Sequence, residues 1–217
     1  MTLVETLISS VLFAFVIAGV YSVYTAMQGT LTRGEMKADL QQNARIGLGR
    51  MVSEIRMAGS DPSGVLSSAL PPPRAAIRAA AAGCLSFIAP DELGNTKQIT
   101  YSLDGPNLRR REQPWNSSES TFTGGSVQPV AEAMHQLLFT YYDQHNKVIA
   151  PAAWSSTHAC PPDKNATTIA SVTQLTYWQM QQIRRITIAL RTWKDPQVPG
   201  LAPEFFTLTT DVRLRNR

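Results

Sequence analysis

The first 27 residues of the chain form a strongly apolar segment, and this segment limits what the rest of the chain can do. Glu5 is its only charged residue, and the first basic residue is Arg33. The hydrocarbon core of a bilayer is roughly 30 Å thick and needs about 20 apolar residues in a helix. A signal peptide would show a basic leading region, a shorter apolar core and a small-residue cleavage site. Residues 1–27 show none of these features and therefore predict a membrane anchor.

Glu5 is the anomaly in this segment, and two interpretations of it stay open. A carboxylate near the start of a helix gains about 0.3–1 kcal/mol from the helix dipole, so the acid could simply be tolerated there. Alternatively, Glu5 awaits a cation in the membrane, and the free amine of Met1 in a neighbouring, axially displaced copy fits this role. At about 4 Å and an effective dielectric near 20, such a pair gains on the order of 4 kcal/mol before desolvation. It would also fix the stagger between adjacent helices.

Beyond this segment the sequence turns polar but keeps helical spacing. An apolar stripe recurs every three or four residues, as on one face of a helix: Leu40, Ala44, Leu48, Val52 and Ile55. Gly59 and Pro62 mark its end. An unbroken helix from Met1 to Ala58 would be about 87 Å long at 1.5 Å per residue. Only its first half fits a bilayer, so residues 28–59 must lay their stripe on a globular domain.

Two details of this second half lead to further expectations. Gly29 and Gly34 flank two threonines, and each glycine weakens a helix by about 1 kcal/mol relative to alanine, so bending is expected there if packing demands it. Arg50 and Glu54 have the spacing of an i,i+4 ion pair, which is predicted on the solvent side of the helix.

The remaining residues, 60–217, carry strand signals and predict one β-rich head domain. Alternating or continuous apolar runs indicate strands in five places: Leu85–Ile88, Ile99–Leu103, Leu137–Tyr142, Ile186–Leu190 and Phe206–Leu214. Asp104–Asn107 has the composition of a turn. Antiparallel hairpins that pack one face onto the helix stripe give an α+β fold.

Three stretches rich in small and polar residues predict loops: 60–83, 114–126 and 150–170. Within the first of them a short helix is expected after Pro71–Pro73. Long loops in compact domains are often functional. Partner contacts are therefore expected at 114–126 and 150–170, and variable surface decoration is the alternative.

Cys84 and Cys160 are the only two cysteines. Neither lies in a CxxC or CxxCH motif, so the spacing supports neither a zinc site nor c-type haem. In an oxidising compartment the two could close a long loop, for which the chain-entropy model gives about 4 kcal/mol. In the cytosol they would be buried free thiols. We predict the Cys84–Cys160 disulfide.

No catalytic, cofactor or metal site is predicted. GxxxxGK(S/T), GxGxxG, GxSxG and HExxH do not occur, and His135, His145 and His158 are far apart in sequence. The net charge of +4 comes from scattered basic residues, with clusters at Arg109–Arg111 and Arg213–Arg217. These clusters are interpreted as solvated strand faces and a basic tail, because nucleic-acid domains usually show a basic stripe interleaved with aromatics. Neither an enzyme nor a nucleic-acid partner is expected.

The stretch MTLVETLI, with Glu5 opening an apolar helix, resembles the mature N-terminus of type IV pilins and type II secretion pseudopilins. That family is cut after a glycine by a prepilin peptidase and N-methylated at the new first residue. The resemblance therefore implies that Met1 is the processed, methylated residue; Phe is usual there and Met is an accepted variant. Family pilins often carry a helix-kinking proline near position 22, where this chain has Ser22, and this departure favours a minor pilin.

The stretch LQQNARIGLGRMVSEIRMAG, residues 40–59, is similar to the end of the helix in PilW-like minor pilins and J-type pseudopilins. This resemblance implies a pilin-like fold with a two-sheet head domain. It also implies a structural subunit of a type IV pilus, or fimbrium, or of a type II secretion pseudopilus. Residues 1–27 would hold the subunit in the inner membrane, with the head in the periplasm, until the inner-membrane assembly machinery moves it into a filament.

In such a filament the partners are other pilin or pseudopilin subunits, bound through the N-terminal helix, with Glu5 and Met1 as the assembly residues. The alternative is a singly anchored extracytoplasmic binding protein or enzyme that does not enter filaments. The position of Glu5 argues against this alternative, because a simple anchor has little use for an acid.

Overall fold

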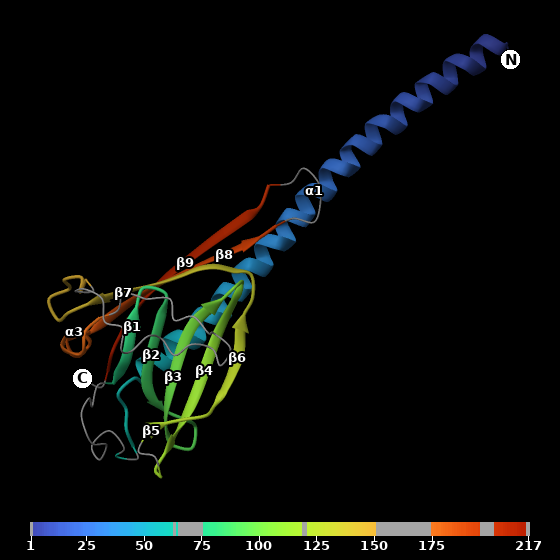
Figure 1. Cartoon of the computed structure of the whole chain (residues 1–217). Helices are drawn as coiled ribbons and strands as arrows, with labels where there is room; N and C mark the ends of the chain where they lie inside the picture. Colours follow the sequence, from blue (N-terminus) through green and yellow to red (C-terminus); the bar gives the residue numbers. More distant parts are fainter. Residues whose placement is uncertain are drawn as a thin grey trace.

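A computed structural model of the chain describes residues 2–62, 64, 76–118, 121–150, 175–195 and 202–215. Its longest element is α1 (Leu3–Arg56), one helix of 54 residues and about 81 Å at 1.5 Å per residue. Its first half projects away from the strands, which gather around its second half (Figure 1). The helix passes through Gly29 and Gly34 without interruption. After α1 the chain turns at Gly59, whose φ of +82° favours glycine.

The strands of the described residues form two antiparallel sheets. The six strands of the first sheet are β1 (Ile77–Ala81), β2 (Cys84–Pro90), β3 (Thr96–Asp104), β4 (Asn107–Asn116), β5 (Thr121–Phe122) and β6 (Ser126–Ala131). β1 to β4 pair in chain order, and both β5 and β6 pair with β4. The three strands of the second sheet, also in chain order, are β7 (Met134–Tyr142), β8 (Arg185–Lys194) and β9 (Glu204–Arg213). A short helix, α3 (Tyr177–Gln182), precedes β8.

The predicted fold class is confirmed: the protein is α+β, with a long N-terminal helix packed on antiparallel sheets in a pilin-like arrangement. The buried face of α1 contains most of the predicted stripe and three further residues: Leu40, Ala44, Leu48 and Ile55 with Met36, Gly47 and Met51. Val52 is only partly buried against the same core. This face packs mainly on β8 and β9 and also contacts β6 and β2.

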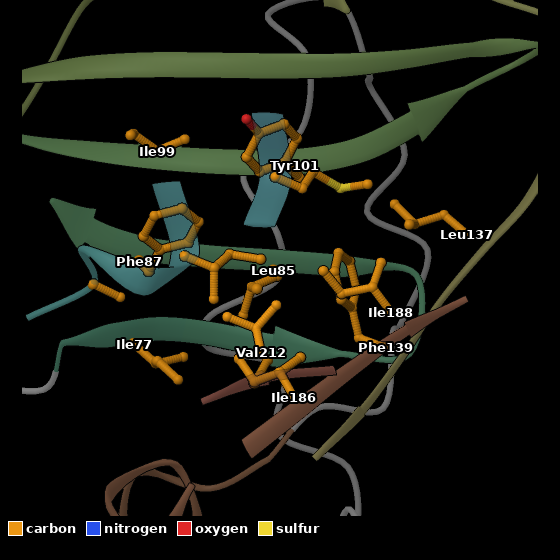
Figure 2. Close-up of a cluster of buried hydrophobic side chains, with 14 of the residues drawn as sticks. Ile77, Leu85, Phe87, Ile99, Tyr101, Leu137, Phe139, Ile186, Ile188 and Val212 are labelled. Carbon is orange, nitrogen blue, oxygen red and sulfur yellow. The ribbon is translucent and has the colours of Figure 1, made fainter. Parts of the chain in front are cut away.

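The hydrophobic core lies between the two sheets and the second half of α1. Figure 2 shows one cluster built from both sheets: Ile77, Leu85, Phe87, Ile99 and Tyr101 from the first, and Leu137, Phe139, Ile186, Ile188 and Val212 from the second. Polar contacts also cross between the sheets. The Tyr141 hydroxyl donates to the Ala81 carbonyl at 2.7 Å, and the Phe139 backbone N–H donates to the Ala82 carbonyl at 2.7 Å. The two sheets are therefore packed against each other as one unit.

Four of the five predicted strand positions fall within β2, β3, β7 and β8, and the fifth matches β9 except that Leu214 lies one residue beyond it. The predicted turn Asp104–Asn107 joins β3 to β4, with Gly105 at a φ of +56°.

The loop predicted at 60–83 is wrong for Ile77–Ala81, which is strand β1. Alanine has low strand propensity, but its small side chain fits where β1 is buried beside β2 and the core. The helix expected after Pro71–Pro73 would begin in residues outside the described ones. The loop predicted at 114–126 is also wrong in part, because it contains the end of β4, all of β5 and the start of β6.

Gly47 lies where α1 crosses the core, and its substitution gives a test of this packing. A Cβ there would lie 2.9 Å from Leu108 Cδ2 and 3.3 Å from the Ala131 Cβ. Overpacking typically costs about 1–3 kcal/mol, against a helix-propensity gain of about 1 kcal/mol. Gly49, two residues away, has open space at its Cβ position.

We expect Gly49→Ala to be more stable than Gly47→Ala by about 1–3 kcal/mol, because only Gly47→Ala meets the steric cost. Denaturant unfolding of the detergent-solubilised chain measures both. Equal stabilities of the two variants would contradict the packing at Gly47.

Candidate functional site

The first half of α1 presents an apolar surface on every side. Residues 2–28 are all exposed, and the large hydrophobic side chains between Leu3 and Met27 are 47–81% exposed. The helix is long and apolar enough to cross a membrane, and none of its most apolar window is buried. Exposed apolar surface of this extent marks a contact with lipid or with other apolar surfaces. We call residues 3–27 the anchor segment.

Glu5 lies in the first turn of the anchor segment. Its Oε2 accepts a hydrogen bond from the Thr2 backbone N–H at 3.4 Å, and Thr2 is the N-cap of the helix. This is half of a capping-box arrangement, in which an acid at the third helical position satisfies an otherwise free N–H. The carboxylate is exposed and has capacity for another donor. Its pairing with the Met1 amine of a neighbouring subunit stays a prediction, and Met1 itself lies outside the described residues.

A second polar site joins the last turns of α1 to the first sheet. Arg110 Nε donates to both carboxylate oxygens of Glu54, at 3.0 and 2.9 Å, and the Tyr101 hydroxyl donates to Glu54 at 2.7 Å. Arg110 also donates to Glu112, which forms an ion pair with Lys97 at 3.2 Å. Together these five side chains form what we call the Glu54 network. The side chain of Arg110 is 3% exposed and that of Glu54 is 13% exposed.

Burial shapes the protonation of this network. It raises the pKa of Tyr101 well above its ordinary value, and the negative charge of Glu54 adds to this effect. The Tyr101 hydroxyl therefore stays a donor. For Arg110, burial alone would lower the pKa, but hydrogen bonds to Glu54 and Glu112 outweigh it and the pKa is raised. Each charged group of the network has a partner, so the network stabilises the contact between α1 and the first sheet.

The Glu54 network corrects two expectations. Arg50 does pair with Glu54, with Nε to Oε1 at 3.4 Å, but Glu54 is turned toward the sheet and is not on the solvent side. Arg110, expected on a solvated strand face, is buried. Arg110 lies two residues after Leu108 on the same, buried face of β4, so the period-2 pattern of this strand was the available signal. Nothing in the sequence placed its partner on α1.

The pKa of Glu112 gives a testable pH dependence. Burial alone would raise this pKa, but hydrogen bonds from Arg110 and Lys97 outweigh it and hold the pKa below its ordinary value. Such a group stabilises the fold above its unfolded pKa of about 4.3, and the contribution is lost as pH falls through the folded value. We expect the native chain to exceed Glu112→Gln in unfolding free energy at pH 6, with the gap closing as pH falls below about 4. A gap independent of pH would contradict this assignment.

The other predicted site residues are placed only in part. Cys84 is disulfide-bonded. Cys160 lies outside the described residues, so the pairing of the two stays a prediction. Most of the loop 150–170 is also outside them, and partner contacts there stay untested. Within the described ranges, no group of three or more His, Cys, Asp or Glu side chains is arranged to hold a metal ion.

Comparison with models of known protein families gives no match, and no curated protein matches the chain in sequence.

Proposed function

We propose that the chain is a structural subunit of a type IV pilus or type II secretion filament, and a minor pilin or pseudopilin rather than an enzyme. The observation that carries this proposal is the anchor segment, which is apolar on every side, fully exposed and continuous with the helix that carries the head. Such a segment needs lipid before assembly and neighbouring apolar helices after it.

In this proposal the subunit first waits in the inner membrane through residues 1–27, with its head in the periplasm. The inner-membrane assembly machinery then transfers it into a bundle of like helices, where helix–helix packing replaces lipid. Glu5 moves from its bond with the Thr2 N–H to the amine of Met1 on an adjacent subunit. That partner is another pilin or pseudopilin chain.

Shearing of intact cells tests the proposal against a simple membrane anchor. We expect the chain in the sheared or secreted filament fraction together with other subunits. The filament proposal fails if the chain stays entirely with the membrane when filaments are recovered. The intact mass of the N-terminal peptide adds a second test, since a methylated Met1 is expected.

A further inference from the structure

The surface of the second sheet carries an aromatic cluster that the proposed function does not use. Trp193 at the end of β8 and Phe205 at the start of β9 are direct cross-strand partners, and they are 38% and 43% exposed. His135 of β7 packs beside both rings, with centroid distances of 6.4 and 5.9 Å. The Arg191 guanidinium lies 4.4 Å from the Phe205 ring centroid. We call these four residues the aromatic edge.

The aromatic edge faces away from α1. Along β8, Ile188, Leu190 and Thr192 are buried, and the alternate side chains, Arg191 and Trp193 among them, point to the opposite face. Lys194 returns to the helix side, where its Nζ lies 3.2 Å from Asp39 Oδ2. This contact places the edge beside Asp39 in the second half of α1, at the end of the head nearest the anchor segment (Figure 1).

The length of the anchor segment brings this edge toward a bilayer. Residues 3–27 make about 37 Å of helix at 1.5 Å per residue, whereas the hydrocarbon core is about 30 Å thick. A tilt of about 35° removes the mismatch and lies within the range of membrane helices. Asp39, about 18 Å further along the axis, then stands about 15 Å above the hydrocarbon.

A sheet packed about 10 Å from the helix axis, on the side toward which the helix leans, is lowered by about 6 Å at this tilt. Its outward side chains then come within one side-chain length of the headgroup region, which extends about 5–8 Å above the hydrocarbon. Interfacial aromatic and basic residues are what set the rotation of a tilted helix. The aromatic edge supplies such residues on one side of the head.

We propose that the aromatic edge is a docking surface for the phospholipid headgroups of the membrane that holds the subunit. Trp193 and Phe205 supply amphipathic and apolar area, and Arg191 supplies a donor for the lipid phosphate. Acids accompany the cations at this end of the sheet: Glu204 is the cross-strand partner of Lys194, Asp195 follows β8, and Glu132 precedes Ala133, whose carbonyl accepts from the Trp193 N–H. We therefore expect contact with zwitterionic phospholipid, without a requirement for anionic lipid. This inference rests on the membrane-anchored state of the proposed function.

The test uses the full chain in phosphatidylcholine vesicles that carry a headgroup spin label in both leaflets. The chain has four tryptophans, so one variant keeps only Trp193 and a matched variant keeps only Trp178. Trp178 is 75% exposed on α3, at the far end of the head from the anchor segment. We expect the label to quench Trp193 fluorescence and to leave Trp178 fluorescence unchanged. Trp193→Phe in the otherwise native chain should remove most of the quenched fraction, which keeps the test usable if a multiple variant folds poorly.

Carbonate extraction of the same vesicles distinguishes a failure of the proposed function from a failure of the docking surface alone. A chain that is released was never anchored, and the proposed function itself then fails. A chain that stays inserted with Trp193 no more quenched than Trp178 overturns the docking surface and leaves the anchor intact. If Trp193 fluorescence changes with the density of subunits in the vesicle and not with the labelled lipid, a neighbouring subunit covers the edge. This result also overturns the proposal.

Discussion

Replacing Glu5 by alanine is expected to leave membrane insertion intact and to reduce incorporation into filaments by about tenfold or more. Insertion is unimpaired because the substitution removes a charge from an apolar helix. Incorporation falls because the Met1 amine of the neighbour loses its counter-ion. An ion pair at about 4 Å gains on the order of 4 kcal/mol at an effective dielectric near 20. If only 1.4 kcal/mol of this survives desolvation, the effect is still about tenfold.

The capping contact of Glu5 makes a second variant necessary. In the isolated chain the carboxylate accepts from the Thr2 N–H, and glutamine can take the same role in a capping box. Glu5→Gln thus keeps the cap and removes the charge. Both variants should be depleted from sheared filaments and present at native levels in membranes. Normal incorporation of Glu5→Gln alongside failure of Glu5→Ala would assign Glu5 to capping and refute the charge pair.

Periodicity predicted the parts of the fold in which burial follows a simple repeat. The helix stripe and the alternation of β8 and β9 are of this kind, because each buries one face against a single neighbouring layer. β1 was not predicted, because its run of alanines shows no apolar/polar alternation and alanine has low strand propensity. α3 escaped because six residues are too few for a helical pattern, although Thr176 and Gln179 form a capping box at its start.

The candidate sites differ in the same way. The anchor segment is a local property of consecutive residues, and so it could be predicted from sequence alone. The Glu54 network depends on β4 lying beside the last turns of α1, with 56 residues separating Glu54 from Arg110. Spacing within one element cannot reveal such a partner. The aromatic edge likewise arises only when three strands bring His135, Trp193 and Phe205 together.

Removing Arg110, the buried cation of the Glu54 network, should have the largest effect on stability. Arg110→Met leaves the Glu54 carboxylate 13% exposed in the native geometry and without the Arg110 Nε–H that both of its oxygens share. Breaking a buried ion pair from one side costs about 3–5 kcal/mol. Because Glu54 is on α1 and Arg110 is on the first sheet, the loss weakens the contact between α1 and that sheet. We expect the denaturation midpoint to fall with an unchanged slope.

Arg109→Met is the matched control, one residue away on β4. Arg109 pairs with Asp104, but these side chains are 34% and 52% exposed, and surface pairs contribute only about 0–1 kcal/mol. The double variant Glu54→Gln/Arg110→Met should recover much of the loss, because it leaves no unpaired buried charge. If Arg110→Met and Arg109→Met lose equal stability, the Glu54 network is not what fixes the head on α1. The helix stripe alone would then have to transmit any force between anchor and head.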